Sequence, residues 1–316
     1  MRRILVRWYY EVKPWIPRYV QVMVRRQLTQ AKRKRVRDWW PIEESAGKVP
    51  EHWCGWPDGK TFALILTHDV ESDSGQGKCS ELMQIEKDRG FLSSFNFVPE
   101  RYAVSKELRE FLTEQGYEVG VHDLKHDGKL YKSKQSFFRK AERINRYLEE
   151  WNAVGFRSGA MHHNLEWIHA LNVRYDASTF DTDPFEPQPD GIGTIFPSWI
   201  RRNGTDEGYV ELPYTLPQDF TMFVLLQEEN VDIWRRKLDW IVERGGMALL
   251  NTHPDYMDFG GRNKRYDAYP VARYIEFLDF VRSAYKDRYW NALPKDLASY
   301  ISERFRNQPD HSRHGD

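Results

Sequence analysis

The sequence predicts an α/β fold built on a parallel sheet, and three observations support this prediction. From residue 60 onward, apolar runs of strand length alternate with longer amphipathic stretches. No internal repeat and no Pro/Gly-rich linker divides residues 60–306, so a single domain accounts for them. The chain has 316 residues, enough to bury a large core, and its 40% hydrophobic content excludes a disordered chain.

A basic arm, residues 1–45, precedes this domain. Its first 40 residues contain 12 Lys or Arg against two acidic residues, although the whole chain is neutral. Val20, Val24, Leu28 and Ala31 recur at helical spacing, which predicts an amphipathic helix. The helix either docks its apolar face on the acidic body or lies on an anionic membrane surface. Nucleic acid is not expected as a partner, because no base-reading motif accompanies the charge.

The compartment is predicted from the cysteines and from the first residues. Cys54 and Cys79 cannot form a disulfide framework, and their spacing matches no zinc motif. The chain starts without the unbroken apolar stretch of a secretory signal. We therefore expect a cytoplasmic protein, with peripheral contact to the inner face of the membrane as the alternative role of residues 1–40. Residues 307–316 are expected to form a disordered tail.

Strands and helices follow in turn along the domain. Strands are expected at residues 62–69, 93–100, 118–124, 155–160, 173–179, 209–215 and 247–254. Helices are expected at residues 81–90, 106–116, 135–152, 230–246, 271–286 and 294–306. The fourth helix has the clearest boundaries, with Asn230 as a cap at its start and Gly245 at its end.

Acids, imidazoles and one guanidinium follow the predicted strands at their carboxyl ends. They are His68, Asp69 and Glu71 after the first strand, His122, Asp123 and His126 after the third, Arg157 after the fourth and His253 after the last. In parallel α/β folds the carboxyl ends of the strands collect at one edge, where ligands and catalytic groups gather. The repetition of the pattern predicts an active site at that edge.

Each of these residues also has an ordinary structural explanation. His122 and His126 face one cation if the chain is helical there, but this spacing is common by chance. Asp69 and Glu71 point the same way on an extended chain, where surface caps are the alternative. Arg157 has a surface salt bridge as its alternative, and His253 a place in the core.

Together the motifs resemble the polysaccharide deacetylases, the domain of nodulation-protein-type or chitooligosaccharide deacetylases, over about residues 60–255. The family's first motif, Thr-Phe-Asp-Asp-Gly, is similar to Thr67-His68-Asp69-Val70-Glu71. Its second, His-(Ser/Thr)-x-x-His, is similar to the segment from His122 to His126. The third, fourth and fifth motifs resemble Arg157-Ser158-Gly159, the stretch from Asp176 to Asp183, and Leu249-Leu250-Asn251-Thr252-His253.

The resemblance implies a distorted (β/α) barrel of about seven parallel strands that binds one divalent metal, commonly zinc. His122 and His126 would be two of the metal ligands. The family's usual third ligand corresponds to Val70, which cannot bind a metal. In a variant of the motif, acid-Val-acid, Glu71 takes that place, and Asp73 is the fallback.

The implied chemistry is amide hydrolysis with the metal-bound water as nucleophile. Asp69 would be the base, held ionised by Arg157, and His253 the acid that protonates the departing amine. Asp181 or Asp183 would orient His253. Candidate substrate contacts are His68, His162 and Tyr214.

The predicted function is therefore removal of an N-acetyl group from an amino sugar or glycan precursor by a metal-dependent hydrolase. One alternative is hydrolysis of cyclic amides, as in the allantoinase-like branch of the same fold. The other is a catalytically inactive, membrane-associated binding protein, for which Val70 is the best argument.

Overall fold

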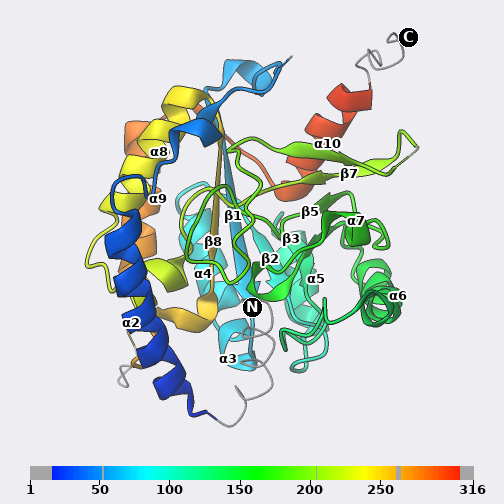
Figure 1. Ribbon diagram of the computed structural model, residues 1–316, viewed down its shortest axis with the longest axis horizontal. Coiled ribbons are helices and arrows are strands. Elements are labelled where there is room, and N and C mark those ends of the chain that lie inside the picture. The colour runs from blue at the N-terminus through cyan, green and yellow to red at the C-terminus, as the bar shows by residue number, and fades with distance from the viewer. Residues whose placement is uncertain (1–15, 52, 204, 261–264, 307–316) are drawn as a thin grey trace.

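The computed structural model describes residues 16–51, 53–203, 205–260 and 265–306 (Figure 1). Residues 1–15 of the predicted arm and the predicted tail, residues 307–316, lie outside the described residues. None of the helices in the described ranges is both long and apolar enough to span a bilayer.

All seven predicted strands are present, and neighbouring strands run parallel. They are β1 (Phe62–Val70), β2 (Ser94–Phe97), β3 (Glu118–His122), β4 (Gly155–Arg157), β5 (Tyr175–Asp176), β7 (Gly208–Glu211) and β8 (Met247–Thr252). β8 pairs with β1, and single parallel bridges from Phe180 to Tyr214 and from Leu216 to Leu250 connect β5, the end of β7 and β8. The strands therefore form the predicted distorted barrel.

β1 is the central strand of the barrel. β8 runs along one side of it, while β11 (Tyr289–Asn291) and β2 share the other side. All nine residues of β1 are buried, as expected for a strand with both faces covered. The sequence analysis missed β11, together with β6 (Ser198–Arg201), β9 (Met257–Asp258) and β10 (Tyr269–Pro270), each of four residues or fewer.

Helices cover the outside of the barrel (Figure 1). The predicted ones are α4 (Cys79–Lys87), α5 (Lys106–Glu114), α6 (Lys134–Glu150), α8 (Asp232–Arg244), α9 (Ala272–Ala284) and α10 (Pro294–Arg306). Gly245 ends α8 with a φ of 70°, a conformation that glycine adopts without strain. At the other end, the N-cap is Val231 and not the predicted Asn230, which lies one residue earlier and accepts a hydrogen bond from the amide of Asp232 (3.0 Å).

Shorter helical segments lie in the connections. The α-helical ones are α3 (Asp73–Gln76) and α7 (Leu165–Ile168), and η5 (Phe220–Leu225) is a π-helix. The 3₁₀ turns are η2 (Glu44–Gly47), η3 (Pro57–Gly59), η4 (Gly159–Met161) and η6 (Pro254–Tyr256). Three of these segments, η4, η5 and η6, contribute residues to the cavity described below.

The arm contains one long helix, α2 (Arg18–Val36), which runs along the body beside η5 (Figure 1). Arg26 donates to the carbonyl oxygen of Val224 (2.7 Å), and Gln30 to that of Leu226 (2.9 Å). The helix thus docks on its own chain, one of the two predicted alternatives. Membrane contact through residues 1–40 stays a prediction.

The predicted docking face of this helix is wrong. Val22, Thr29 and Val36 are the buried residues, whereas Val24 is 52% exposed and Leu28 66% exposed. Hydrophobic spacing shows which residues share a face, but not which face meets the body: Val22, Thr29 and Val36 recur at intervals of seven and form a different face. The exposed stripe therefore has no packing role in the described structure.

Two buried acids lie side by side on neighbouring strands of the barrel. Asp176 and Glu211 are register partners of β5 and β7, and both are fully buried. Burial raises the pKa of Asp176 to about 6 and raises that of Glu211 well above its usual range. Because two neighbouring buried carboxylates do not both ionise, the folded protein keeps a proton between them.

This pair predicts a loss of stability as the pH rises. The folded-state pKa values lie above the unfolded ones, so the stabilisation is complete at low pH and is lost as the pH rises through about 6. Asp176→Asn is therefore expected to raise the free energy of unfolding at pH 8 by about 2 kcal/mol, and by about half as much at pH 5. Urea unfolding of both proteins at the two pH values measures this. An equal effect at pH 5 and pH 8 would contradict the shared proton.

Candidate metal centre and active site

The end of β1 supplies two acids to one side of the sheet. Asp69 and Glu71 alternate along the strand with His68 and Val70, which point to the other side. Asp69 and Glu71 both line a cavity at the carboxyl end of the barrel, whereas Val70 belongs to the hydrophobic core. The prediction that the two acids point the same way is confirmed.

His68 is not a substrate contact, so that prediction is wrong. It is fully buried, with Nε2 at 2.8 Å from Glu86 Oε1 and Nδ1 at 2.7 Å from Thr252 Oγ1. The alternation of β1 places it under α4, away from the cavity. It is a core histidine whose ring nitrogens are both satisfied.

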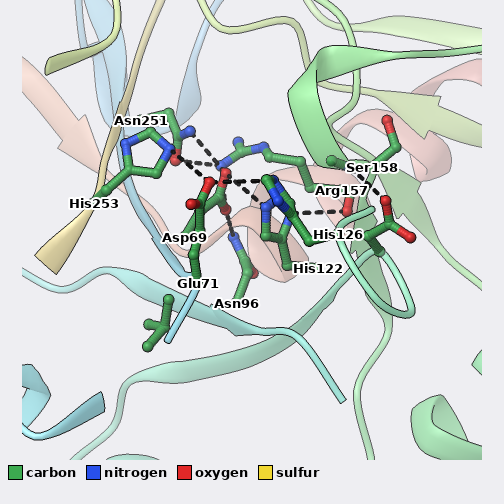
Figure 2. A network of polar contacts seen from close by, with 12 residues as sticks. Asp69, Glu71, Asn96, His122, His126, Arg157, Ser158, Asn251 and His253 are labelled. Carbon is green, nitrogen blue, oxygen red and sulfur yellow. Dashed lines mark hydrogen bonds and ion pairs between the residues drawn. The ribbon is translucent and has the colours of Figure 1, made fainter. Parts of the chain in front are cut away.

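Asp69 is held by three polar side chains, from β2, β4 and β8 (Figure 2). Arg157 pairs with its Oδ1 at 3.2 Å, Asn96 donates to the same oxygen (3.1 Å), and Asn251 donates to Oδ2 (2.8 Å). Burial alone would raise the pKa of this carboxyl, but Arg157 and nearby imidazoles hold it well below the usual range. Asp69 is therefore ionised, as predicted, and fixed in orientation.

Glu71, His122 and His126 form a cluster with metal-binding potential. One ligand atom from each lies within 4.8 Å of the others; His122 is buried, and Glu71 and His126 are only slightly exposed. His126 Nε2 is 3.1 Å from Glu71 Oε1. Asp73 is exposed at the start of α3 and does not belong to the cluster.

His122 has the ring nitrogen best suited to bind a metal ion. Its Nδ1 lies 3.0 Å from the carbonyl oxygen of Arg157, so Nδ1–H donates there and Nε2 keeps its lone pair. Nε2 is buried and has no hydrogen-bond partner in the described structure. Burial lowers the pKa of His122 to about 4, which keeps the imidazole neutral, the form that binds metals. The cluster therefore fits a divalent cation.

A tight loop, not a helix, brings the two histidines together. Asp123 and His126 have φ values of 56° and 52°, in the left-handed region. The Asp123 carboxylate accepts hydrogen bonds from the amides of Leu124 (2.5 Å) and Gly159 (3.2 Å). These bonds tie the loop after β3 to η4 and hold His126 beside His122.

Gly159 leaves room for this loop. A Cβ at this position would lie 2.6 Å from Asp123 Oδ2 and 2.7 Å from His126 Cδ2. Gly159→Ala is therefore expected to displace both and to weaken zinc binding about 10- to 100-fold. Chelator competition measures the affinity. The control is Gly77→Ala, where a Cβ would find its nearest neighbour, the Asp73 carbonyl oxygen, at 3.7 Å. Equal zinc affinity in both variants would contradict this role of Gly159.

His253 lies on the opposite side of the cluster, with Nε2 at 4.0 Å from Glu71 Oε1. Its Nδ1 is 2.7 Å from Asp219 Oδ1, and its backbone amide donates to Asp219 Oδ2 (2.8 Å). Burial opposes the charged ring, but Asp219 outweighs it and raises the pKa of His253 to about 10. The imidazolium is thus available as a proton donor at neutral pH.

The carboxylate that orients His253 is Asp219, so the prediction of Asp181 for this role is wrong. The Asp181 carboxylate pairs with Lys237 Nζ at 2.5 Å, and both side chains are buried. Burying the Lys237 ammonium requires such a partner, so Asp181 ties α8 to the loop after β5. Asp183, the other candidate, accepts from the amide of Phe185 (2.9 Å).

The two remaining predicted substrate contacts do not reach the cavity. Tyr214 is fully buried and donates to Glu186 Oε1 (2.7 Å), so the prediction for Tyr214 is corrected; Glu186 does line the cavity. His162 is not among the described residues that line it.

Several residues of the site were missed or given no role. Asn96 and Asn251 hold Asp69, Asp219 holds His253, and Asp255 accepts a hydrogen bond from the amide of Glu71 (2.8 Å). Asp219 follows the strand predicted at residues 209–215, so the strand-end rule extended by a few residues finds it. Asn96 is inside β2, where sequence alone gives no such signal.

The cavity has a volume of about 670 Å³, within the range of small-molecule sites. Asp69, Glu71, His122, His126 and His253 line one part of it, and α2 lines another. An ionised carboxylate, a cationic imidazole and a cluster suited to a divalent cation thus share one space. This combination suits hydrolysis of a bond whose leaving group needs a proton.

No family model and no curated protein matches the sequence. Among solved structures, a protein from Mycobacterium smegmatis assigned as a polysaccharide deacetylase has a TM-score of 0.60 and 19% identity, covering 81% of this chain and 95% of its own. One from Pseudomonas aeruginosa PAO1 with the same assignment has a TM-score of 0.61 and 16% identity, covering 85% and 100%. The Puue allantoinase has a TM-score of 0.59 and 14% identity, covering 84% and 98%. The chain therefore has the fold shared by these polysaccharide deacetylases and the allantoinase.

Proposed function

We propose that the protein is a metal-dependent hydrolase that removes an N-acetyl group from an amino sugar or glycan precursor. The observation that carries the proposal is the buried Nε2 of His122, which has no hydrogen-bond partner in the described residues and lies 3.8 Å from Asp69 Oδ2, in a cluster beside ionised Asp69 and cationic His253. The fold shared with polysaccharide deacetylases supports it.

Glu71, His122 and His126 would hold the metal. Two imidazoles and one carboxylate are a ligand set typical of catalytic zinc, and they leave positions open for water and substrate. When bound, the metal supplies polarisation of the amide carbonyl and a lower pKa of water.

Asp69 and His253 move the protons. The Asp69 carboxylate accepts a proton from the attacking water; Arg157 and Asn251 fix its orientation. The His253 imidazolium donates its proton to the amide nitrogen, which leaves poorly as an anion, and Asp219 stabilises the charged ring until then.

Hydrolysis of a cyclic amide is the second candidate, because the Puue allantoinase shares the fold at a similar TM-score. The same acid, base and metal ligands serve both reactions. The binding-protein alternative rested on Val70, which lies in the hydrophobic core and cannot bind a metal. Glu71 offers a carboxylate to the cluster in its place, which weighs against that alternative.

Substrate assays test the proposal. The purified protein, loaded with zinc, is expected to release acetate from N-acetylglucosamine glycosides or oligomers and to leave allantoin intact. Removal of the metal with a chelator is expected to abolish acetate release, and added zinc to restore it. Ring opening of allantoin without acetate release would favour the second candidate. If the protein binds the metal but catalyses neither reaction, the proposed hydrolase is refuted.

A further inference from the structure

The cavity extends from the metal-binding cluster along α2. Four aliphatic residues line it at intervals of four, namely Ile16, Val20, Val24 and Leu28. Val20, Val24 and Leu28 belong to α2, where residues four apart lie on one face and eight residues extend over about 12 Å, while Ile16 precedes the helix. The helix therefore presents an aliphatic stripe to the cavity.

Apolar residues from outside α2 also line the cavity. They are Phe185, Phe220, Leu225 and Met161, from the loop after β5, from η5 and from η4. Arg25 of α2 lies over the Phe220 ring at 4.8 Å from its centroid. Polar residues such as Glu186 and Gln218 complete the lining, so the part of the cavity beside α2 is largely but not wholly apolar.

The stripe is not needed to hold the helix in place. Val24 and Leu28 line the cavity and are still 52% and 66% exposed, while Val22 and Thr29 make the buried contacts of α2. On a helix otherwise rich in Arg and Lys, apolar side chains kept open along a catalytic cavity indicate a ligand surface.

One end of the stripe is fixed beside the cluster. Arg18 donates to the hydroxyl of Tyr256 (3.1 Å), and that hydroxyl donates to Glu71 Oε2 (3.2 Å). The first turn of α2 is therefore connected to a metal-binding residue through a single side chain. A ligand that places its amide at the cluster would extend its other end over Val24 and Leu28.

We infer that the substrate carries an apolar chain, and that this chain lies in the groove between α2 and η5 while the N-acetyl group lies at the cluster. The inference rests on the proposed function and narrows its substrate class to an amphiphilic glycoside. Sugar rings require hydrogen-bonding groups or aromatic faces, and the aliphatic stripe of α2 offers neither. A hydrocarbon chain gains from such a surface in proportion to the area it buries.

Two glycosides that differ only in the chain test the inference. The zinc-loaded enzyme is assayed with the methyl and the octyl β-glycoside of N-acetylglucosamine, the octyl compound below its micelle concentration. Each buried methylene strengthens binding by up to about fourfold, so KM for the octyl glycoside is expected to be at least about tenfold lower. Val24→Ser/Leu28→Ser is expected to reduce this ratio towards one.

Matched variants distinguish a contact with the octyl chain of the substrate from damage to the helix. Met23→Ser changes an equally exposed residue of α2 outside the cavity (54% exposed) and is expected to keep the ratio of the wild type. Leu28→Met keeps an apolar side chain and is expected to keep it too. If Leu28→Met lost the ratio as fully as the serine variant, apolar contact would not be the cause.

The outcomes distinguish the inference from the proposed function. Acetate release with equal KM values for both glycosides would overturn the inference and retain the deacetylase. Calorimetric binding of the octyl glycoside, lost in the serine variant but without acetate release, would overturn the deacetylase and retain the apolar groove. If the serine variant lost only binding to anionic vesicles, the stripe would be a membrane contact and the inference wrong.

Discussion

Alanine at both His122 and His126 is expected to remove the bound metal and to lower acetate release at least about 1,000-fold. Two of the three candidate ligands are lost, and a metal contributes several kcal/mol to the stabilisation of the transition state. Elemental analysis of the purified proteins measures the change. We expect about one equivalent of zinc in the wild type and almost none in the variant.

A single control separates loss of the site from loss of the fold. His169→Ala removes a half-buried histidine at the end of α7, outside the cavity, and is expected to keep both zinc and activity. Circular dichroism should show the same helix content in all three proteins. One equivalent of zinc retained by the double variant would contradict the assignment of the ligands.

Asp219→Asn is expected to lower kcat by about 10²- to 10⁴-fold, the usual contribution of a positioned acid or base. Asp219 is the main cause of the raised pKa of His253, which burial otherwise lowers. Without the negative charge, the pKa of His253 falls, since only the weaker effects of Glu71 and Asp69 then oppose burial. A smaller fraction of the rings then carries the proton at neutral pH.

The pH profile identifies this mechanism. Activity that depends on protonated His253 is lost as the pH rises through its pKa, so the alkaline limb should move to lower pH in Asp219→Asn. The double variant Asp219→Asn/His253→Ala should be no slower than His253→Ala alone, since Asp219 acts through His253. An unshifted alkaline limb, or additive losses in the double variant, would contradict this role.

Much of the fold is predictable from the sequence. Each predicted strand and helix is present, because the apolar runs of β1 and β8 and the amphipathic spacing of α6 and α8 are strong local signals. The short strands β6 and β11 were missed because three or four half-buried residues have no recognisable period. Their strand conformation depends on the partner strand, which is distant in sequence.

The site was predicted where the chain itself fixes the geometry. The alternation of β1 places Asp69 and Glu71 together, and Arg157 meets Asp69 because β1 and β4 both end at the same edge of the barrel. Asp219 and Tyr256 could not be assigned, since their contacts depend on how η5 and η6 lie against the barrel. The packed face of α2 was wrong for a similar reason: an amphipathic pattern does not say whether the apolar face meets protein or a cavity.

The contact between Arg18 and Tyr256 affects the order in which the protein folds during its synthesis. The two residues are 238 positions apart, and the contact from Arg26 to Val224 spans 198. At about 5 to 20 residues per second, a ribosome exposes α2 roughly 10 to 50 s before its docking partners exist. During that time the aliphatic stripe and the basic side chains are open to other molecules. α2 is thus synthesised well before its docking partners, and the part of the cavity that it lines cannot form until most of the barrel has folded.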